Sequence, residues 1–273
     1  MFLNRNLPEF KLSLQIKDNK FMQTLMGKEK NWLLQKTFKE FVEDLICLDK
    51  QSQSFRPGSK ISPDNKNWEN SPANYQDEKL IIGNTEVMCD WERPLMEAMA
   101  RAVTENHGDV LEVGFGMGIS ATYIQEFGVK SHTIIEFNNE VFEVCQRWQE
   151  KYPDRDIRLI HGKWQDAIEK LDRKFDGIFY DIAPTSDEEE TKNLIENVAA
   201  DADPFFPWAS SCLKDGGIFT YYTQEIDSLS RRHQRLLLQH FSSFSVSLVK
   251  GMNPPEDCEY WYTDSMAVVK AIK

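Results

Sequence analysis

The chain has 273 residues, of which 41% are hydrophobic, and a formal net charge of −12 at pH 7. This length and composition are sufficient for one buried α/β core, or for two small domains. The negative charge opposes binding to nucleic-acid phosphates and favours small or cationic substrates instead.

The first 60 residues carry a helical pattern that differs from the rest of the chain. Apolar residues recur there at helical spacing, at Trp32, Leu33, Phe38, Phe41, Val42, Leu45 and Ile46. This pattern predicts an amphipathic helix, which could pack on the main domain, act as a lid or form a homodimer. Residues 51–70 are rich in Ser, Pro, Asn and Lys and are typical of a linker. We therefore divide the chain into a helical extension at 1–60 and a main domain at 61–273.

From residue 85 onward, strands and helices alternate as they do in a doubly wound α/β sheet. Strands are predicted at 110–113, 131–136, 157–161, 175–181, 217–222, 244–249 and 267–272. Helices are predicted at 86–103, 119–127, 140–152, 164–171, 188–212 and 229–241. Seven strands closed by a hairpin would form the Rossmann-like, mostly parallel sheet of a class I methyltransferase.

A glycine-rich turn follows the first of these strands, in the sequence Asp109-Val-Leu-Glu-Val-Gly-Phe-Gly-Met-Gly-Ile119. Its glycines allow the backbone to turn sharply and to approach a ligand. Glu112 precedes the first glycine, where a carboxylate would repel the pyrophosphate of a dinucleotide. The ammonium and sulfonium of S-adenosylmethionine would not be repelled, so the turn favours that cofactor.

Glu136 ends the next predicted strand, at the position where an acid can accept hydrogen bonds from the ribose hydroxyls of an adenosine. The alternative is that Glu136 only begins a loop. Trp164 precedes Asp166, and this pair could form one wall and one acceptor of an adenine site. A tryptophan at this position could equally belong to the core.

Two further carboxylates suggest the substrate. Asp181 ends a predicted strand, at the edge of the sheet where doubly wound folds bind ligands. Glu92 lies ahead of the core, in Trp91-Glu92-Arg-Pro94. Two carboxylates beside a sulfonium methyl favour a cationic acceptor, and a guanidinium matches carboxylates in a bidentate manner. The alternative for Glu92 is a surface acid in an i,i+4 ion pair.

The chain resembles the guanidinoacetate N-methyltransferase family, within a guanidino-methylating group that includes arginine δ-N-methyltransferases. The motifs that carry the resemblance are Trp68-x-x-x-Pro72-Ala-x-Tyr75, Val87-Met-x-x-Trp91-Glu92-x-Pro94-x-Met96, Val110-Leu-Glu-Val-Gly-Phe-Gly-Met117, Ile134-Ile-Glu136, Gly162-x-Trp164-x-Asp166, Phe175-Asp-Gly-Ile-x-Tyr-Asp181, Leu213-Lys-x-Gly-Gly-x-x-Thr-Tyr221 and Pro254-Pro-x-Asp-Cys-x-Tyr260. They occur in order over residues 68–273, and the first 60 residues have no counterpart.

The resemblance implies a set of cofactor-binding residues: Trp68, Met88, Met96, Gly114, Phe115, Gly116, Met117, Gly118, Ile119, Glu136, Lys163, Trp164 and Asp181. It also implies that Glu92 and Asp181 hold the guanidinium. Because a guanidinium stays protonated near neutral pH, the site must orient one nitrogen and accept a proton from it. We expect Asp181 to accept this proton and Glu92 to anchor the opposite edge.

One segment departs from the family. The guanidinoacetate enzymes have a Tyr-Cys-Asn-Leu-Thr type segment whose backbone receives the substrate carboxylate, whereas this chain has Tyr221-Tyr-Thr-Gln-Glu225-Ile-Asp227. Acids at that place would repel a carboxylate. We therefore expect Thr223, Gln224 and Glu225 to bind a different guanidino substrate, such as arginine, an arginine derivative or an arginine side chain in a peptide.

Three classes of function remain open. The first is methylation of a small guanidino metabolite. The second is methylation of arginine within a peptide or protein, with residues 1–60 as a partner-binding module. The third is a methyltransferase-like binding protein without activity, against which Gly114, Glu136 and Asp181 argue.

The remaining features predict no metal and no membrane. The five cysteines lack Cys-x-x-Cys spacing and the five histidines lack ligand spacing, which favours reduced thiols and no metal site. There is no signal-like apolar start and no run of 18 apolar residues, so we expect a cytoplasmic protein. The acidic run at 187–190 and the basic cluster at 231–235 are interpreted as solvated helix segments.

Overall fold

The structure is a computed structural model that describes residues 67–76, 78–183, 199–256, 258 and 260–273. The chain divides into two units, Met1–Cys47 and Leu48–Lys273, and all described residues belong to the second unit. The predicted extension at 1–60, its amphipathic helix and the acidic run at 187–190 lie outside the described residues.

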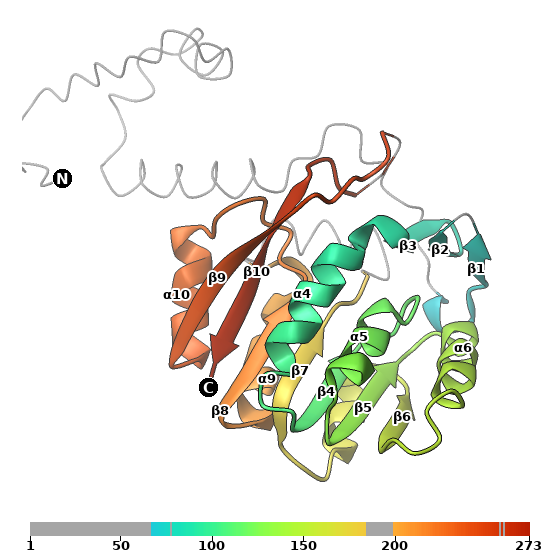
Figure 1. Cartoon of the computed structure of the whole chain (residues 1–273), viewed down its shortest axis with the longest axis horizontal. Coiled ribbons are helices and arrows are strands. Elements are labelled where there is room, and N and C mark those ends of the chain that lie inside the picture. The colour runs from blue at the N-terminus through green and yellow to red at the C-terminus, as the bar shows by residue number, and fades with distance from the viewer. Residues whose placement is uncertain (1–66, 77, 184–198, 257, 259) are drawn as a thin grey trace, which may run out of the picture. The chain divides into compact units, whose positions relative to one another are not determined.

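A seven-stranded sheet forms the centre of the described domain (Figure 1). Its strands stand in the order β6-β5-β4-β7-β8-β10-β9. Their bounds are β4 (Asp109–Val113), β5 (Ser131–Glu136), β6 (Ile157–His161), β7 (Phe175–Tyr180), β8 (Leu213–Tyr221), β9 (Ser243–Lys250) and β10 (Ser265–Ile272). Strands β4 to β8 pair in parallel, and β10 runs antiparallel to both β8 and β9. This arrangement confirms the predicted class I methyltransferase sheet.

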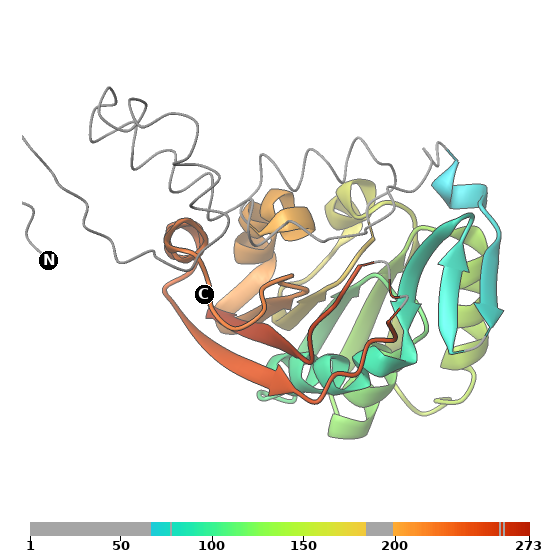
Figure 2. The same ribbon diagram turned by 90° about the horizontal axis from the view of Figure 1, so that it is seen from above.

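Helices cover both faces of the sheet (Figures 1 and 2). One core cluster joins the sheet to α4 (Arg93–Val103), α5 (Ile119–Phe127) and α6 (Asn139–Gln149). The other joins it to α7 (Trp164–Ala167), the 3-10 turn Ile168–Lys170, α9 (Phe206–Cys212) and α10 (Arg231–His240). Alternate residues of β4 supply the two clusters, because successive side chains of a strand point to opposite faces. No helix within the described ranges is long and apolar enough to cross a bilayer.

A small three-stranded sheet precedes α4 and was not predicted. It consists of β1 (Ala73–Gln76), β2 (Lys79–Ile82) and β3 (Thr85–Cys89), and it follows a single 3-10 turn at Trp68–Asn70. Figure 2 shows it, in cyan and blue-green, at one end of the main sheet. The predicted helix start at residue 86 is therefore wrong. Residues of β3 pair with β2, and α4 begins only at Arg93, where Pro94 suits the first helical turn.

The predicted helix at 188–212 is interrupted in its described part. Residues 199–212 form a 3-10 segment (Ala200–Phe205) followed by α9. Pro204 and Pro207 lack the backbone N–H that a continuous helix would require, so the segment is split. Strand β8 begins at Leu213, four residues earlier than the sequence pattern predicted at 217.

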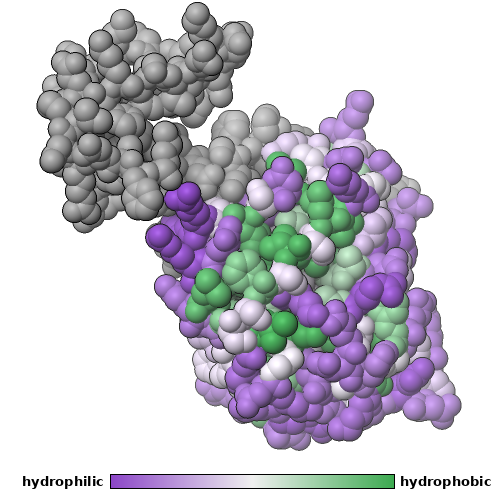
Figure 3. Space-filling model, turned by 60° about the vertical axis from the view of Figure 1, so that its left-hand side comes forward, coloured by the Kyte–Doolittle hydropathy of each residue, from purple (hydrophilic) through white to green (hydrophobic). Residues whose placement is uncertain are grey.

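Exposed apolar side chains gather at the far edge of the sheet. Val246 and Leu248 of β9 and Leu238 of α10 are exposed, and α10 packs beside β9. Figure 3 brings this side forward and shows a green apolar area within the purple surface. Because β10 and β8 separate β9 from β7, this area takes no part in the site described below.

Candidate active site

Parallel pairing brings the ends of three strands to one edge of the sheet. Val113, the last residue of β4, is in register with Ile135 of β5 and with the last residue of β7. The residues that follow, Gly114, Glu136 and Asp181, therefore emerge close together. Gly114 N–H donates to the Ile135 carbonyl at 2.9 Å, and Asp181 N–H donates to the Val113 carbonyl at 3.0 Å. The glycine turn thus lies between two of the predicted site carboxylates.

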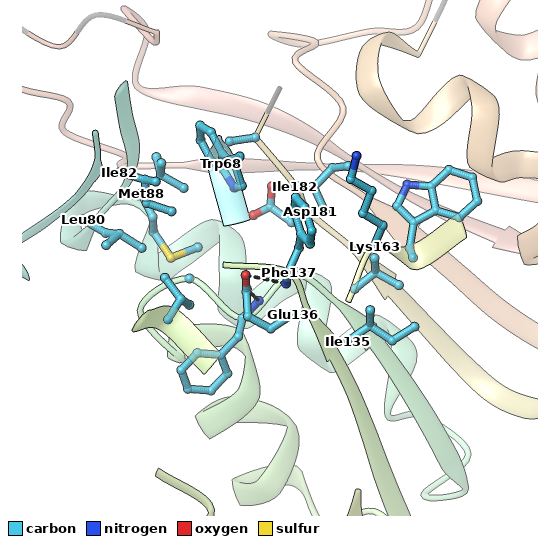
Figure 4. Close-up of a pocket in the computed structure, with 18 of the residues that line it drawn as sticks. Trp68, Leu80, Ile82, Met88, Ile135, Glu136, Phe137, Lys163, Asp181 and Ile182 are labelled. Atoms are coloured by element: carbon cyan, nitrogen blue, oxygen red, sulfur yellow. Dashed lines mark hydrogen bonds between the residues drawn. The ribbon is translucent and has the colours of Figure 1, made fainter. Parts of the chain in front are cut away.

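A cavity opens at this edge, and the space within it, including the part open to solvent, measures about 980 Å³. In Figure 4, Met88 lies with Leu80 and Ile82 on one side and Lys163 on the other, with Trp68, Asp181 and Glu136 between them. The predicted site residues that line the cavity are Trp68, Met88, Gly114, Phe115, Gly116, Glu136, Lys163, Trp164 and Asp181.

The glycine turn packs closely against other residues of the site. A Cβ at Gly114 would lie 2.0 Å from the Asp181 carbonyl oxygen, and φ there is +90°. A Cβ at Gly116 would lie 3.0 Å from the sulfur of Met88, with φ at +55°. Because only glycine adopts these conformations at little cost, and because a Cβ would meet these neighbours, the turn requires glycine at both positions.

Glu136 faces the cavity with a buried carboxylate. Its Oε2 accepts a hydrogen bond from Phe115 N–H at 3.0 Å, and its Oε1 accepts from Phe137 N–H at 2.7 Å and Asn138 N–H at 2.8 Å. Burial raises the pKa of Glu136, and these hydrogen bonds offset only part of the effect. A carboxylate can accept about four hydrogen bonds, so Oε2 retains capacity for a ligand hydroxyl.

Asn138 fixes the segment that carries Trp68. Its Nδ2 donates to the carbonyl oxygens of Trp68 at 2.7 Å and Ser71 at 2.8 Å. Its Oδ1 caps α6 by accepting from the N–H groups of Glu140 and Val141. Sequence reasoning missed Asn138, although an asparagine just ahead of a predicted helix is the usual N-cap signal.

Glu92 and Asp181 form an acidic pair beside the cavity. Glu92 is 2% exposed, and its Oε1 accepts hydrogen bonds from Cys89 N–H at 2.8 Å and from the Tyr260 hydroxyl at 2.5 Å. Within the described ranges, no group donates a hydrogen bond to Oε2 of Glu92 or to the carboxylate of Asp181, and no cation pairs with either. The pair therefore presents unused acceptors.

Burial raises the pKa of both acids. The pKa of Glu92 rises to about 8, first through burial and then through the nearby charge of Asp181. The pKa of Asp181 rises to about 7, again through burial and then through the charges of Asp201 and Glu112. A bound cation would favour the ionised forms, so this arrangement suits a cationic ligand.

Some predicted cofactor residues do not line the cavity. Met96 is a fully buried core residue of α4, Gly118 is the N-cap of α5, and Ile119 is the first residue of that helix. Met117 is also absent from the cavity lining. Its backbone N–H donates a hydrogen bond to the sulfur of Met88, with 3.4 Å between nitrogen and sulfur. Glu92 does not line the cavity either, but its charge interacts with that of Asp181, which does.

The three predicted substrate residues after β8 also lie outside the cavity lining. The Thr223 hydroxyl donates to a backbone carbonyl of β10 at 2.6 Å. The Glu225 carboxylate lies 3.1 Å from Nδ1 of His233, whose other ring nitrogen contacts the Tyr221 hydroxyl. Gln224, between them, has a φ of +55°. The side chains of Thr223 and Glu225 therefore hold this segment against α10 and β10.

Glu112 does not face the cavity. It is fully buried, its Oε1 accepts from the Ser120 hydroxyl at 2.5 Å, and its Oε2 lies 2.9 Å from Nε2 of His132. Because side chains alternate along β4, Glu112 points toward the α5 and α6 face. The sequence argument that placed this carboxylate beside the cofactor is therefore wrong, and the cofactor assignment rests on the other residues.

Sequence reasoning also missed the rest of the cavity lining, most of which is apolar. The additional lining residues are Leu80, Ile82, Val87, Val113, Ser120, Ile135, Phe137, Val141, Gly162, Gln165, Ile182 and Ala183. Those from β2 and β3 could not be found because the small sheet was not predicted. Phe137 and Ile182 directly follow the strand-end acids, which is a signal that could have identified them.

The described cysteines are free thiols. Cys89 and Cys145 are buried, and Cys212 and Cys258 are half-buried. Burial raises the pKa of Cys89 to about 12 and raises that of Cys145 further, so both are protonated at neutral pH. In the part of the chain that the structure describes, no group of three or more His, Cys, Asp or Glu residues could hold a metal ion.

Comparison with known sequences gives one family match. The sequence model of guanidinoacetate N-methyltransferase matches residues 55–273, which is more than half of the chain. Protein arginine N-methyltransferase 2 of Candida glabrata is 36% identical over 124 residues, covering 41% of this chain and 29% of that protein. The protein of the same name in Yarrowia lipolytica is 31% identical over 159 residues, covering 54% and 30%. The match thus spans less than a third of the length of these relatives.

Solved structures that align with this chain are distant in sequence. Spermidine synthase from Thermotoga maritima aligns with a TM-score of 0.49 at 16% identity, covering 71% of this chain and 64% of that one. An O-methyltransferase from Bacillus cereus, solved in complex with SAH, aligns with a TM-score of 0.44 at 13% identity, covering 93% and 97%.

Proposed function

The chain belongs to the guanidinoacetate N-methyltransferase family, and we propose that it methylates a guanidino nitrogen of a small metabolite such as arginine or an arginine derivative. S-adenosylmethionine is the methyl donor. The observation that carries the proposal is the acidic pair, because Glu92 is buried, Asp181 is half-buried, their charges are coupled, and neither has a cation partner among the described residues. A guanidinium supplies both the missing charge and the N–H donors.

The cavity fits S-adenosylmethionine, which supplies an electrophilic methyl group on a sulfonium. Glu136 has capacity to accept from ribose hydroxyls, and Gly114 and Gly116, which have no side chains, line the cavity beside it. Trp68 and Phe137 offer apolar surface for the adenine. These residues would bind and orient the cofactor.

The two acids would have different roles toward the guanidinium. Oε2 of Glu92 accepts from one edge of the guanidinium, and Asp181 accepts from the nitrogen that is to be methylated. As the new N–C bond forms and the bond between the methyl group and the sulfonium breaks, leaving S-adenosylhomocysteine, this nitrogen gives up a proton, and the Asp181 carboxylate takes it. A pKa near 7 suits a group that must be ionised before the reaction and protonated after it.

A panel assay tests the proposal. The full chain is incubated with S-adenosylmethionine and guanidinoacetate, L-arginine, agmatine or an arginine-containing peptide, and S-adenosylhomocysteine is measured. We expect turnover with at least one guanidino compound and none with L-lysine, whose ammonium lacks the planar fork. Binding of the cofactor without turnover on any guanidino compound would instead support the non-catalytic class of function.

Asp181→Asn provides the matched test of the site. We expect unchanged affinity for S-adenosylhomocysteine by calorimetry and a loss of turnover of roughly 10²- to 10⁴-fold. Asp172→Asn is the control, because Asp172 is an exposed acid that pairs with Arg158 away from the cavity. Near-normal turnover of the Asp181 variant would remove this residue from the mechanism.

A second candidate is methylation of arginine within a peptide or protein. It is favoured by the matched relatives, which carry the name protein arginine N-methyltransferase 2. The two candidates differ in kcat/KM for free L-arginine and for an arginine-containing peptide, measured with the same full chain. A preference of tenfold or more for the peptide would select the second candidate.

A further inference from the structure

The segment between β9 and β10 reaches across to the acidic pair. Its Tyr260 donates a hydrogen bond to Oε1 of Glu92 at 2.5 Å, and the two residues are 168 positions apart in sequence. Cys89 N–H donates to the same oxygen at 2.8 Å. Oε2 receives no hydrogen bond from any residue in the described ranges, so the two oxygens of Glu92 have different roles.

Tyr260 is itself held in place. Its ring packs against Trp91, with ring centroids 5.6 Å apart and planes inclined by 32°. Trp91 directly precedes Glu92, in the same 3-10 turn Asp90–Glu92. Burial and the charge of Glu92 hold the pKa of the Tyr260 hydroxyl well above its usual value, so it remains a donor at neutral pH. The orientation of Glu92 is therefore fixed by neighbours on both sides.

We propose that Tyr260 is a positioning residue that favours the carboxylate form of Glu92 and holds it turned so that only Oε2 is offered to the guanidinium. The proposal rests on the function proposed above. With two donors already on Oε1, that oxygen has little capacity left. A guanidinium therefore bridges Oε2 of Glu92 and the carboxylate of Asp181, rather than forming a bidentate pair with Glu92 alone. This geometry refines the bidentate pairing expected from sequence.

The ionisable groups around Glu92 come from three parts of the chain. They are Glu86 and Cys89 of β3, Asp181 at the end of β7, and Cys258 and Tyr260 of the β9 to β10 segment. Glu86 and Asp181 raise the pKa of Glu92, whereas the hydrogen bonds from Tyr260 and from Cys89 N–H lower it. Removing the Tyr260 hydroxyl must therefore raise the pKa of Glu92 above its present value of about 8.

The first test measures Glu92 directly and needs no substrate. The full chain is labelled with ¹³C-glutamate, the Glu92 side-chain signal is assigned with Glu92→Gln, and pH titrations of the wild type and Tyr260→Phe are compared. We expect the midpoint to rise by about 0.5 to 1 pH unit. Tyr262→Phe is the control, because Tyr262 is exposed and its ring packs against Trp261. Equal midpoints in the wild type and Tyr260→Phe would overturn the proposal.

The second test uses turnover. With the guanidino compound that the panel selects, we expect the acidic limb of kcat/KM to move to higher pH in Tyr260→Phe. We also expect KM at pH 7 to rise roughly 3- to 10-fold and to recover above pH 9, while affinity for S-adenosylhomocysteine is unchanged. A drop in kcat/KM of equal size at every pH would assign Tyr260 a merely structural role and contradict the proposal.

The outcomes separate the two proposals. A shifted Glu92 titration without turnover on any guanidino compound would support the role of Tyr260 toward Glu92 and contradict the proposed function.

If Tyr260→Phe does not fold, site-specific replacement of Tyr260 by 3-fluorotyrosine keeps the shape of the ring and makes the hydroxyl a stronger hydrogen-bond donor. The Glu92 midpoint must then fall, and an unchanged midpoint would overturn the proposal.

Discussion

The backbone N–H of Phe115 donates a hydrogen bond of 3.0 Å to the carboxylate of Glu136. This contact joins the glycine turn after β4 to the end of the neighbouring strand β5. The same carboxylate binds the N–H groups at the start of the loop that leads to α6. Glu136 therefore organises the cofactor side of the cavity as well as facing it.

Replacing Glu136 should weaken cofactor binding. We expect Glu136→Ala to lower the affinity for S-adenosylhomocysteine by roughly 10- to 100-fold, because hydrogen bonds to a charged group contribute about 1.5 to 3 kcal/mol. Isothermal calorimetry measures the change. Glu143→Ala is the matched control, since Glu143 is an exposed acid of α6 in an i,i+4 pair with Arg147. Equal affinities in the two variants would contradict a cofactor role for Glu136.

Adding one methyl group to the glycine turn should be costly. In Gly114→Ala the new Cβ would meet the Asp181 carbonyl oxygen at 2.0 Å, so the turn and the end of β7 must separate. We expect loss of cofactor binding and a fall in thermal stability. Gly216→Ala also has positive φ but open space around it, and should cost only about 1 to 2 kcal/mol of backbone strain. Similar effects of both substitutions on cofactor affinity would contradict the steric argument.

Glu92 should make the ligand-free chain less stable as pH rises. Its folded-state pKa of about 8 lies above the value of about 4.3 expected in an unfolded chain, so the folded state binds the proton more tightly. Stability from this group is therefore full below about pH 4 and is lost as pH rises to about 8.

Glu92→Gln removes this titration and tests it. Urea denaturation gives the free energy of unfolding of the variant and of the wild type at each pH. We expect the variant's value minus the wild-type value to be about 2 to 4 kcal/mol larger at pH 8.5 than at pH 4.5. Because the same substitution removes an acceptor for the substrate, activity should fall. A stability difference that does not change with pH would show that Glu92 titrates normally.

Glu225 should matter for stability rather than for substrate affinity. It is buried against His233, so we expect Glu225→Ala to lower the free energy of unfolding by about 1 to 3 kcal/mol, with KM changed less than twofold. Asp227→Ala is the control, because Asp227 is exposed and should change stability little. A large rise in KM for Glu225→Ala, without loss of stability, would support the substrate role expected from sequence instead.

Much of the fold could be predicted because its strands are strongly patterned. The bounds of α5, β5 and β6 agree with the sequence analysis at both ends. β5 ends at the acid Glu136, and α5 and β6 each end just before a glycine, Gly128 and Gly162. The small sheet β1 to β3 could not be predicted in this way, since its short strands are stable only through pairing with one another and packing against α4 and α5.

Sequence by itself determined which chemical groups this protein has and the order in which they occur, because motifs and strand periodicity are local properties of the chain. It placed Gly114, Glu136 and Asp181 at strand ends. Tertiary structure alone decided which way the side chains point. Glu112 accepts a hydrogen bond from Ser120 of α5, and Glu225 contacts His233 of α10. Tyr260 donates a hydrogen bond to Glu92, 168 residues away in the sequence. Such contacts depend on strand register and on the packing of distant segments, which no local pattern encodes.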